Sequence, residues 1–463
     1  MSAPLGSADR PLRVAIVGAG PAGFYAAEAL LKQKELVCQI DFFNRLPTPY
    51  GLVREGVAPD HQSIKAVTRV YDKLAAGKDV RYFGNVTFGV DLTHEDLKAH
   101  YDQIVYAVGA QSDRKMGIPG EDLTGSMPAT MFVGWYNGHP DYRDLALDLS
   151  CERVLVVGNG NVAMDVTRIL VSDPDELAKT DMADHALEAL RASKVREVVM
   201  LGRRGPAQAA FTNPELKEFG ELEGVDVIVD PADLELDSLS AAALAEDKTA
   251  TKNVDMLRAY AAKGDTGAPR RIVMRFLVSP VGVLGTDGQV TAVKIEKNQL
   301  TQASDGSMRA QGTGAFEEIP CGMILRSVGY RGVPLPGVPY NNAGGTIPNV
   351  AGRVIAEAGG EVMPGEYVVG WAKRGPSGVI GTNKPDAAAT VVAMIEDVAS
   401  IPAATSDQDV AELLQQRGVD YVSYADWKIL DAYETGQGSE QGRPRVKVTR
   451  VDEMMAIIRA GRG

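Results

Sequence analysis

Two glycine-rich turns are the segments of this 463-residue sequence best suited to chemistry. The first lies in VAIVGAGPAGFYAAEAL, residues 14–30, and fits the pattern G-x-G-x-x-G with Gly18, Ala19, Gly20, Pro21, Ala22 and Gly23. In this pattern the first glycine permits a tight turn, the second lets the backbone approach a pyrophosphate, and the third allows close packing of helix on strand. The N-terminus of the following helix offers unpaired N–H groups to phosphates. The segment therefore predicts a dinucleotide site.

The second turn lies in VLVVGNGNVAMDVTRIL, residues 154–170, and consists of Gly158, Asn159, Gly160, Asn161, Val162 and Ala163. Alanine at the third position is a substitution that the pattern tolerates. The next strand ends in LGRRG, which places Arg203 and Arg204 where an NAD site has a carboxylate. Two guanidiniums suit a 2′-phosphate, because they can bind it through charge-assisted bidentate bonds. The second turn therefore predicts an NADP(H) site.

The first unit is less specific about its nucleotide. Its second strand ends in DFFNRLPTP, so that Asn44 takes the position of the expected ribose-binding acid and Arg45 follows. An asparagine can hydrogen-bond ribose hydroxyls, but this pair does not by itself exclude a phosphorylated nucleotide. We assign FAD to this site from the architecture, because the first domain is split and is closed by a late glycine-rich segment, as a long flavin nucleotide requires.

The elements around the turns repeat. Each copy has an apolar strand, a fingerprint turn, a helix, a second strand and a closing strand that ends in Val-Gly, at 103–110 and 322–330. We predict an α/β protein with two Rossmann-like dinucleotide-binding domains, the NADP domain inserted into the FAD domain. The predicted boundaries are 1–112 for the first part of the FAD domain, 113–332 for the NADP domain and 333–463 for the second part of the FAD domain. A chain that holds both nucleotides is suited to hydride transfer from nicotinamide to flavin.

Composition narrows the class of protein. The hydrophobic fraction is 45% and the formal net charge is −13, which disfavours nucleic acid and anionic membranes as partners. The three cysteines, Cys38, Cys151 and Cys321, form no C-x-x-C pair, which argues against a disulfide framework, a zinc site and a redox dithiol. We expect a cytoplasmic location, no metal, and a monomer in preference to an oligomer.

Three longer motifs resemble the adrenodoxin reductase family, in particular its actinobacterial ferredoxin–NADP reductases. They are LPTPYGLVREGVAPDHQSIK at 46–65, GRRGPAQAAFTNPELKE at 202–218 and YVVGWAKRGPSGVIGTNK at 367–384. The likeness extends over essentially the whole chain. It implies FAD, NADPH and one-electron delivery to an iron–sulfur ferredoxin.

The resemblance also implies site residues. The flavin contacts would include the Gly18–Gly23 turn together with Asn44, Leu52, Val86, Trp371, Gly378, Val379 and Ile380. The NADP contacts would come from Arg114, Asn159, Gly160, Asn161, Val162, Arg203, Arg204 and Glu215. The polar pair of the family's active site would be His61 and Glu218, which we expect to orient the nicotinamide or tune the flavin, since direct hydride transfer needs no general base.

Ferredoxins of this kind are generally acidic, so docking onto a chain of net charge −13 requires a local basic patch. Lys373, Arg374 and Lys384 flank the flavin-closing segment and are the candidates, with Arg203 and Arg204 across the presumed cleft.

Three other functions use similar sequences. A disulfide reductase would need a C-x-x-C pair, and a non-catalytic electron-transfer subunit would normally carry cysteine-rich cluster motifs at its N-terminus. A diaphorase that reduces quinones or dyes uses the same residues as a ferredoxin reductase, and the sequence does not separate the two.

Overall fold

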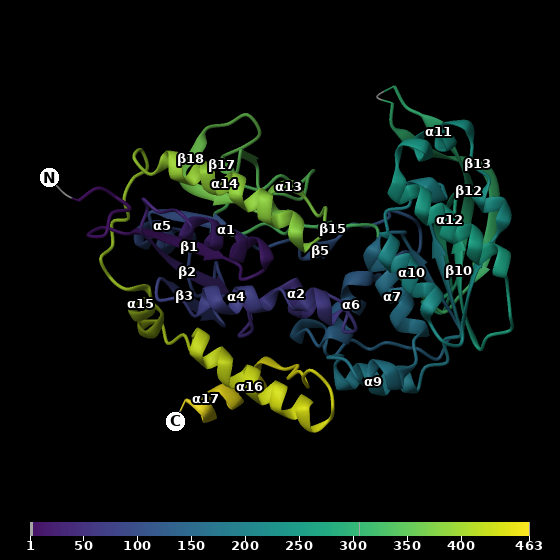
Figure 1. The fold of residues 1–463 in the computed structure, drawn as a ribbon, viewed down its shortest axis with the longest axis horizontal. Helices are drawn as coiled ribbons and strands as arrows, with labels where there is room; N and C mark the ends of the chain where they lie inside the picture. Colours follow the sequence, from purple (N-terminus) through teal and green to yellow (C-terminus); the bar gives the residue numbers. More distant parts are fainter. Residues whose placement is uncertain (1–2, 305, 463) are drawn as a thin grey trace. The chain divides into compact units, whose positions relative to one another are not determined.

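The structure, a computed structural model, describes residues 3–304 and 306–462, which form two compact units (Figure 1). The first unit contains residues up to 57, 61–114 and from 329 onward. The second contains 58–60 and 115–328. The second unit is therefore inserted into the first, as the predicted fold class requires.

The first unit is built on a seven-stranded sheet. Its strand order is β16 (Asn349–Val350), β17 (Arg353–Ile355), β18 (Val362–Val368), β4 (Gln103–Tyr106), β1 (Leu12–Val17), β2 (Cys38–Asn44) and β3 (Val80–Gly84). The pairs from β18 to β3 are parallel, and β16 and β17 are added antiparallel. Because β18 pairs with β4, the late segment of the chain completes the sheet that the N-terminal segment begins.

Both faces of this sheet are covered. Alternate residues of β1 serve opposite cores, Val14 and Ile16 on one face and Ala15 and Val17 on the other, as the two-residue period of a strand requires. The helices of this unit are α1 (Pro21–Leu31), α2 (Leu52–Glu55), α3 (Gln62–Lys65), α4 (Thr68–Ala75), α5 (His94–His100), α13 (Trp371–Arg374), α14 (Asn383–Asp397), α15 (Val410–Gln416), α16 (Tyr424–Glu440) and α17 (Val451–Gly461). A short two-stranded sheet pairs β5 (Ser112–Asp113) with β15 (Tyr330–Arg331), where the chain leaves and re-enters the unit.

The second unit has a six-stranded sheet whose pairs are all parallel. Its order is β6 (Ser126–Pro128), β14 (Met323–Arg326), β7 (Arg153–Val157), β8 (Glu197–Leu201), β10 (Arg270–Arg275) and β9 (Val225–Val229). Its α-helices are α6 (Ala129–Asn137), α7 (Asn161–Val171), α8 (Pro174–Leu177), α9 (Asp184–Arg191), α10 (Asn213–Glu221), α11 (Ser238–Glu246) and α12 (Lys248–Lys263). Val154 and Val156 of β7 pack in the core that these helices help to form.

The opposite face of that sheet is covered by a second, antiparallel sheet. Its strands are β11 (Val278–Thr286), β12 (Gln289–Gln302) and β13 (Met308–Pro320). Leu155 and Val157 of β7 share a core with Val283 and Val293 of this sheet. The apolar run RIVMRFLVSPVGVL is divided between the two sheets, and Leu277, at φ +54°, lies between β10 and β11. Among the described residues, no helix combines the length and apolar character needed to cross a membrane.

Candidate functional site: two dinucleotide cradles

The two glycine-rich turns have the same backbone construction. Gly18 has φ +104°, and a Cβ there would lie 2.6 Å from the carbonyl oxygen of Ala107. Gly158 has φ +134°, and a Cβ there would lie 2.3 Å from the carbonyl oxygen of Ser327. In both units the turn therefore passes directly over the strand that ends in Val-Gly, and only glycine fits.

Each turn leaves room for a phosphate. Apart from the glycine itself, its chain neighbours and the backbone of its own helix, no described atom lies within 4 Å of the position that a Cβ would take on Gly20 or on Gly160. These residues are the N-caps of α1 and α7, and neither helix has a side-chain cap there. Uncapped N–H groups beside an open glycine form the cradle that a pyrophosphate needs. The residues present thus fit a dinucleotide in each unit.

The third fingerprint position explains the difference between the two turns. A Cβ on Gly23 would lie 2.5 Å from the carbonyl oxygen of Gly18 and 3.1 Å from the side chain of Ile16. Ala163, its counterpart, is fully buried in the second core. The first helix lies too close to its strand for a methyl group, whereas the second accepts one.

The side chain of Asn44 holds the first turn in place through hydrogen bonds to the main chain. Its Nδ2 donates to the carbonyl oxygens of Leu46 and Thr48, both at 3.0 Å, and its Oδ1 accepts from the Ala19 N–H at 3.3 Å. The main-chain N–H of Val86, which is buried, donates to the Asn44 carbonyl oxygen. Both amide hydrogens of Asn44 are therefore already used, which leaves only its oxygen for a ribose hydroxyl.

The late glycine-rich segment closes on this turn within the first unit. A Cβ on Gly370 would lie 2.6 Å from the Ala22 Cβ at the start of α1. Trp371, which follows, donates from Nε1 to the Ser377 carbonyl oxygen, and its ring centroid lies 5.1 Å from that of Tyr330. The side chains of Val379 and Leu52 are 60% and 38% exposed, so both are accessible to a ligand. Gly378, with φ +80°, and Ile380 flank Val379 at the start of a short 3₁₀ turn.

Arg374, which the sequence offered only as part of a docking patch, instead has most of its guanidinium inside the late segment. Its Nη2 donates to the carbonyl oxygen of Ser377 and to Asn383. Its Nε and Nη1 are buried and have no partner among the described residues. A cationic edge that is shielded from water without an acceptor suits an anionic or oxygen-rich ligand, so this segment also fits FAD.

The predicted basic patch is only partly correct. Lys373 is 14% exposed, and its Nζ lies 3.1 Å from a carboxylate oxygen of Asp386, so it is not available on the surface. Lys384 is 58% exposed and lies 3.4 Å from Glu28. Spacing in the sequence could not distinguish these two lysines, because Asp386 and Glu28 lie on different helices.

In the second unit, Arg203 is exposed and Arg204 is half-buried directly after β8. Their main-chain carbonyl oxygens accept hydrogen bonds from Asn298 Nδ2 at 2.9 Å and from the Leu277 N–H at 3.1 Å. Among the described residues, neither guanidinium is paired with a carboxylate. The backbone is held while both side chains stay available for a phosphate.

The second turn also positions α10. The main-chain carbonyl oxygen of Asn159 accepts from the Ala210 N–H at 3.0 Å, and the Asn161 Oδ1 accepts from the Thr212 N–H at 3.0 Å. Thr212 is the N-cap of α10, which carries Glu215 and Glu218. Val162, half-buried, packs against the helix-side core. Two residues predicted for NADP thus fix the helix that carries two further predicted residues.

Arg168 forms ion pairs with Glu215 and Glu218, and the sequence analysis did not identify this residue. This guanidinium, on α7, is 3% exposed, with Nη1 2.9 Å from Glu218 and 3.4 Å from Glu215. Its Nε and Nη2 lie 2.8 and 3.0 Å from the two carboxylate oxygens of Asp60, and Nη2 lies 2.9 Å from Asp165. An arginine inside the apolar run of a buried helix was the available signal, because such a charge needs partners.

The remaining predicted residues, His61 and Arg114, lie where the chain passes from one unit to the other. His61 is the half-buried N-cap of α3 in the first unit, next in sequence to Asp60 of the second. Arg114 is exposed, its N–H donates to the Gly329 carbonyl oxygen, and both lie at the end of the two-stranded β5–β15 sheet.

Known proteins resemble this chain over most of its length. Residues 12–227 match the family model described as pyridine nucleotide-disulphide oxidoreductase. The NADPH-ferredoxin reductase FprA of Mycobacterium tuberculosis is 48% identical over 462 residues, covering 97% of this chain and 99% of that protein. The mitochondrial NADPH:adrenodoxin oxidoreductase of Arabidopsis thaliana is 39% identical, covering 97% of this chain and 96% of that protein.

A solved structure agrees with the sequence comparison. Mycobacterium tuberculosis FprA in complex with NADPH superposes with a TM-score of 0.92 at 47% identity, covering 97% of this chain and all of that one. The fold and the motif-based resemblance are thereby confirmed. The chain belongs to the NADPH–ferredoxin reductases of the adrenodoxin reductase type, flavoenzymes that use FAD and NADP(H).

Proposed function

We propose that this chain takes reducing equivalents from NADPH at its second unit and delivers them through FAD to an acidic, ferredoxin-type iron–sulfur protein. The observation that carries the proposal is the presence of two open, uncapped glycine cradles, one in each unit. When bound, FAD accepts a hydride and gives up electrons singly, which is the chemistry that a one-electron acceptor needs.

The residues of the first unit would hold the flavin nucleotide. Gly18–Gly23 would receive the pyrophosphate, and the segment Trp371–Ile380 would close over it, with Leu52 and Val86 as further contacts. Of the Asn44 side chain, only Oδ1 retains hydrogen-bonding capacity. These assignments are proposals, as are the predicted domain boundaries at 112/113 and 332/333, which lie within four residues of the divisions between the compact units at 114/115 and 328/329.

The main contacts of NADPH would come from residues of the second unit. Asn159–Val162 would receive its pyrophosphate and Arg203 with Arg204 its 2′-phosphate, while Glu215 and Arg114 would add contacts. His61 and Glu218 would orient the nicotinamide or tune the flavin rather than act as obligatory catalysts, because direct hydride transfer needs no general base.

We further propose that the protein is monomeric and works in the cytoplasm. All three cysteines are free thiols in the structure, which suits a reducing compartment.

The experiment that tests the function uses the isolated, FAD-loaded chain without oxygen. NADPH should bleach the flavin absorption, and a ferredoxin should then restore it with one-electron stoichiometry. A neutral quinone serves as a comparison. Restoration by the quinone but not by any of several acidic ferredoxins would favour a diaphorase, and an absence of bleaching would refute the proposal.

A further inference from the structure

A strained tyrosine lies next to the flavin cradle. Tyr50 has φ +83°, a region that bulky side chains rarely occupy, although its ring is buried at 5% exposure. Its N–H donates to the Ala19 carbonyl oxygen at 2.8 Å. The next residue, Gly51, approaches so closely that a Cβ would lie 3.1 Å from the Gly20 Cα. The bend therefore rests on the first fingerprint turn and presents Leu52 beside it.

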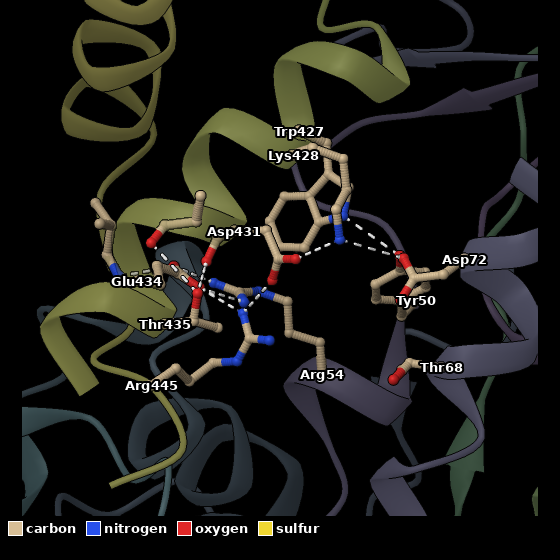
Figure 2. Close-up of polar contacts among 12 residues, drawn as sticks. Tyr50, Arg54, Thr68, Asp72, Trp427, Lys428, Asp431, Glu434, Thr435 and Arg445 are labelled. Carbon is tan, nitrogen blue, oxygen red and sulfur yellow. Dashed lines mark hydrogen bonds and ion pairs between the residues drawn. The ribbon is translucent and has the colours of Figure 1, made fainter. Parts of the chain in front are cut away.

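The ring of Tyr50 is held from the C-terminal part of the chain, as Figure 2 shows. Its hydroxyl donates to Asp72 on α4 at 2.5 Å and accepts from Trp427 Nε1 on α16 at 3.3 Å. Tyr424, also on α16, donates to the same oxygen of Asp72. The strained residue is thus fixed by two helices rather than by its own loop.

A buried ion pair holds the other end of the same segment (Figure 2). Arg54 of α2 donates through Nη1 and Nη2 to the two carboxylate oxygens of Glu434 on α16, at 2.8 and 2.6 Å. These residues are 380 positions apart, and their side chains are 5% and 0% exposed. Lys447 donates to the Arg54 carbonyl oxygen at 3.0 Å. Burial by itself would raise the pKa of Glu434, but Arg54 and Arg445 hold the pKa below its usual value, so the carboxylate is charged.

We propose that α16 clamps the segment 50–54 in the conformation that receives FAD, with Arg54 and Glu434 as positioning residues for the flavin. Local strain persists only where the surrounding structure imposes it. Without the clamp, Tyr50 relaxes to negative φ, the bend leaves Gly20, and FAD binding must then order the loop at a cost in affinity. The inference rests on the proposed placement of FAD in the first unit.

The test compares variants on the same helix. Glu434→Gln breaks the clamp, whereas Asp426→Asn removes a carboxylate that binds Arg462 and caps the opposite end of α16. Each purified protein is stripped of FAD and titrated with it, and the visible circular dichroism of the bound flavin and the far-ultraviolet melting curve are recorded. We expect Glu434→Gln to raise the FAD dissociation constant at least tenfold and to change the flavin dichroism. Asp426→Asn should lower the melting temperature and leave the FAD dissociation constant within twofold.

A second variant covers the case in which an unpaired Arg54 prevents folding. Arg54→Met/Glu434→Leu removes both charges of the pair, so that neither stays buried opposite a neutral side chain, while Glu55 and Arg445 keep their charges. This double variant should fold, and its FAD dissociation constant should, as for Glu434→Gln, be at least ten times that of the unaltered chain.

Retention of FAD within twofold by Glu434→Gln or by the folded double variant would overturn the clamp alone. Equal weakening by Asp426→Asn would also overturn it, because general destabilisation would then suffice. Failure of the unaltered chain to bind FAD would overturn both the clamp and the proposed placement of the flavin.

Discussion

Arg168 Nη1 lies 2.9 Å from the carboxylate of Glu218, although α7 and α10 carry these two residues 50 positions apart. The same guanidinium binds both oxygens of Asp60. A single buried cation thereby joins the fingerprint helix of the second unit, the helix of the proposed active-site glutamate, and the segment that precedes His61.

Replacing Arg168 by Gln should destabilise the second unit strongly. Removing one partner of a buried ion pair typically costs about 3–5 kcal/mol, because the other charges stay buried without compensation. Urea unfolding measures the loss. Arg191→Gln is the control, since Arg191 forms a 3.4 Å pair with Asp175 while both side chains are about half or more exposed, and it should change stability by less than about 1 kcal/mol. Similar effects of the two substitutions would contradict this account of Arg168.

Replacing both Arg203 and Arg204 by Ala should reduce the preference for NADPH over NADH. A hydrogen bond to a charged group contributes roughly 1.5–3 kcal/mol, so the ratio of kcat/KM values should fall about ten- to a hundredfold or more. Arg196→Ala, at the other end of β8, is a matched control whose Nη1 binds only main-chain oxygens. An unchanged ratio in the double variant would refute the assignment of the 2′-phosphate site.

Thiol chemistry should not contribute to turnover. Burial raises the pKa of Cys38 and of Cys321 to about 12, and it also raises that of Cys151, so little thiolate is present at neutral pH. The sequence offered no partner for any of them, but Cys151 in fact packs against Gly322, next to Cys321. A variant with Ala at all three positions should reduce its flavin at nearly the native rate in stopped-flow absorption. A folded, FAD-loaded triple variant that accepts no hydride would contradict this prediction.

The stability of the first unit should depend on pH through His94. Its hydrogen bond to Glu366, 2.9 Å from Nε2, raises its pKa above the ordinary value of 6.5. The stabilisation is therefore complete below that value and is lost as pH rises through the higher pKa of the folded state. The difference in unfolding free energy between the native chain and His94→Gln should shrink as pH rises from about 6 toward about 9. Urea titrations at several pH values measure it, and a difference that grows with pH would contradict the pairing.

Ferredoxin reduction should slow as salt rises. Exposed charges are screened over about 8–10 Å at physiological ionic strength, so steering by Lys384 and its neighbours weakens. Rates with ferredoxin and with menadione are compared at saturating NADPH, and only the first should fall substantially. Lys384→Gln should flatten the salt dependence, whereas Lys179→Gln, on the second unit, should not. If ferredoxin and menadione respond alike, the docking surface is not electrostatic.

The sequence by itself determined the two cradles and the order of the domains. A strand, a glycine turn and a helix are contiguous in the chain, so their geometry follows from local sterics, and Gly18 and Gly158 occupy the conformations that their spacing predicts. The strands at 103–110 and 322–330, which both end in Val-Gly, identified the repeated unit, because this pattern is also local in the sequence. NADP(H) was assigned from Arg203 with Arg204, and FAD from the split first domain and the long family motifs.

Only the tertiary structure decided which charges face each other. Three contacts show this: the Arg168 cluster, the Arg54–Glu434 pair and the Lys373–Asp386 pair. Each connects residues that are far apart in the chain or lie on different helices. The antiparallel pairing of β11, β12 and β13 is likewise known only from the structure. The partner of a buried charge and the neighbour of a strand can both be distant in the sequence. These partners are set by how the helices and sheets pack, which no local pattern of residues specifies.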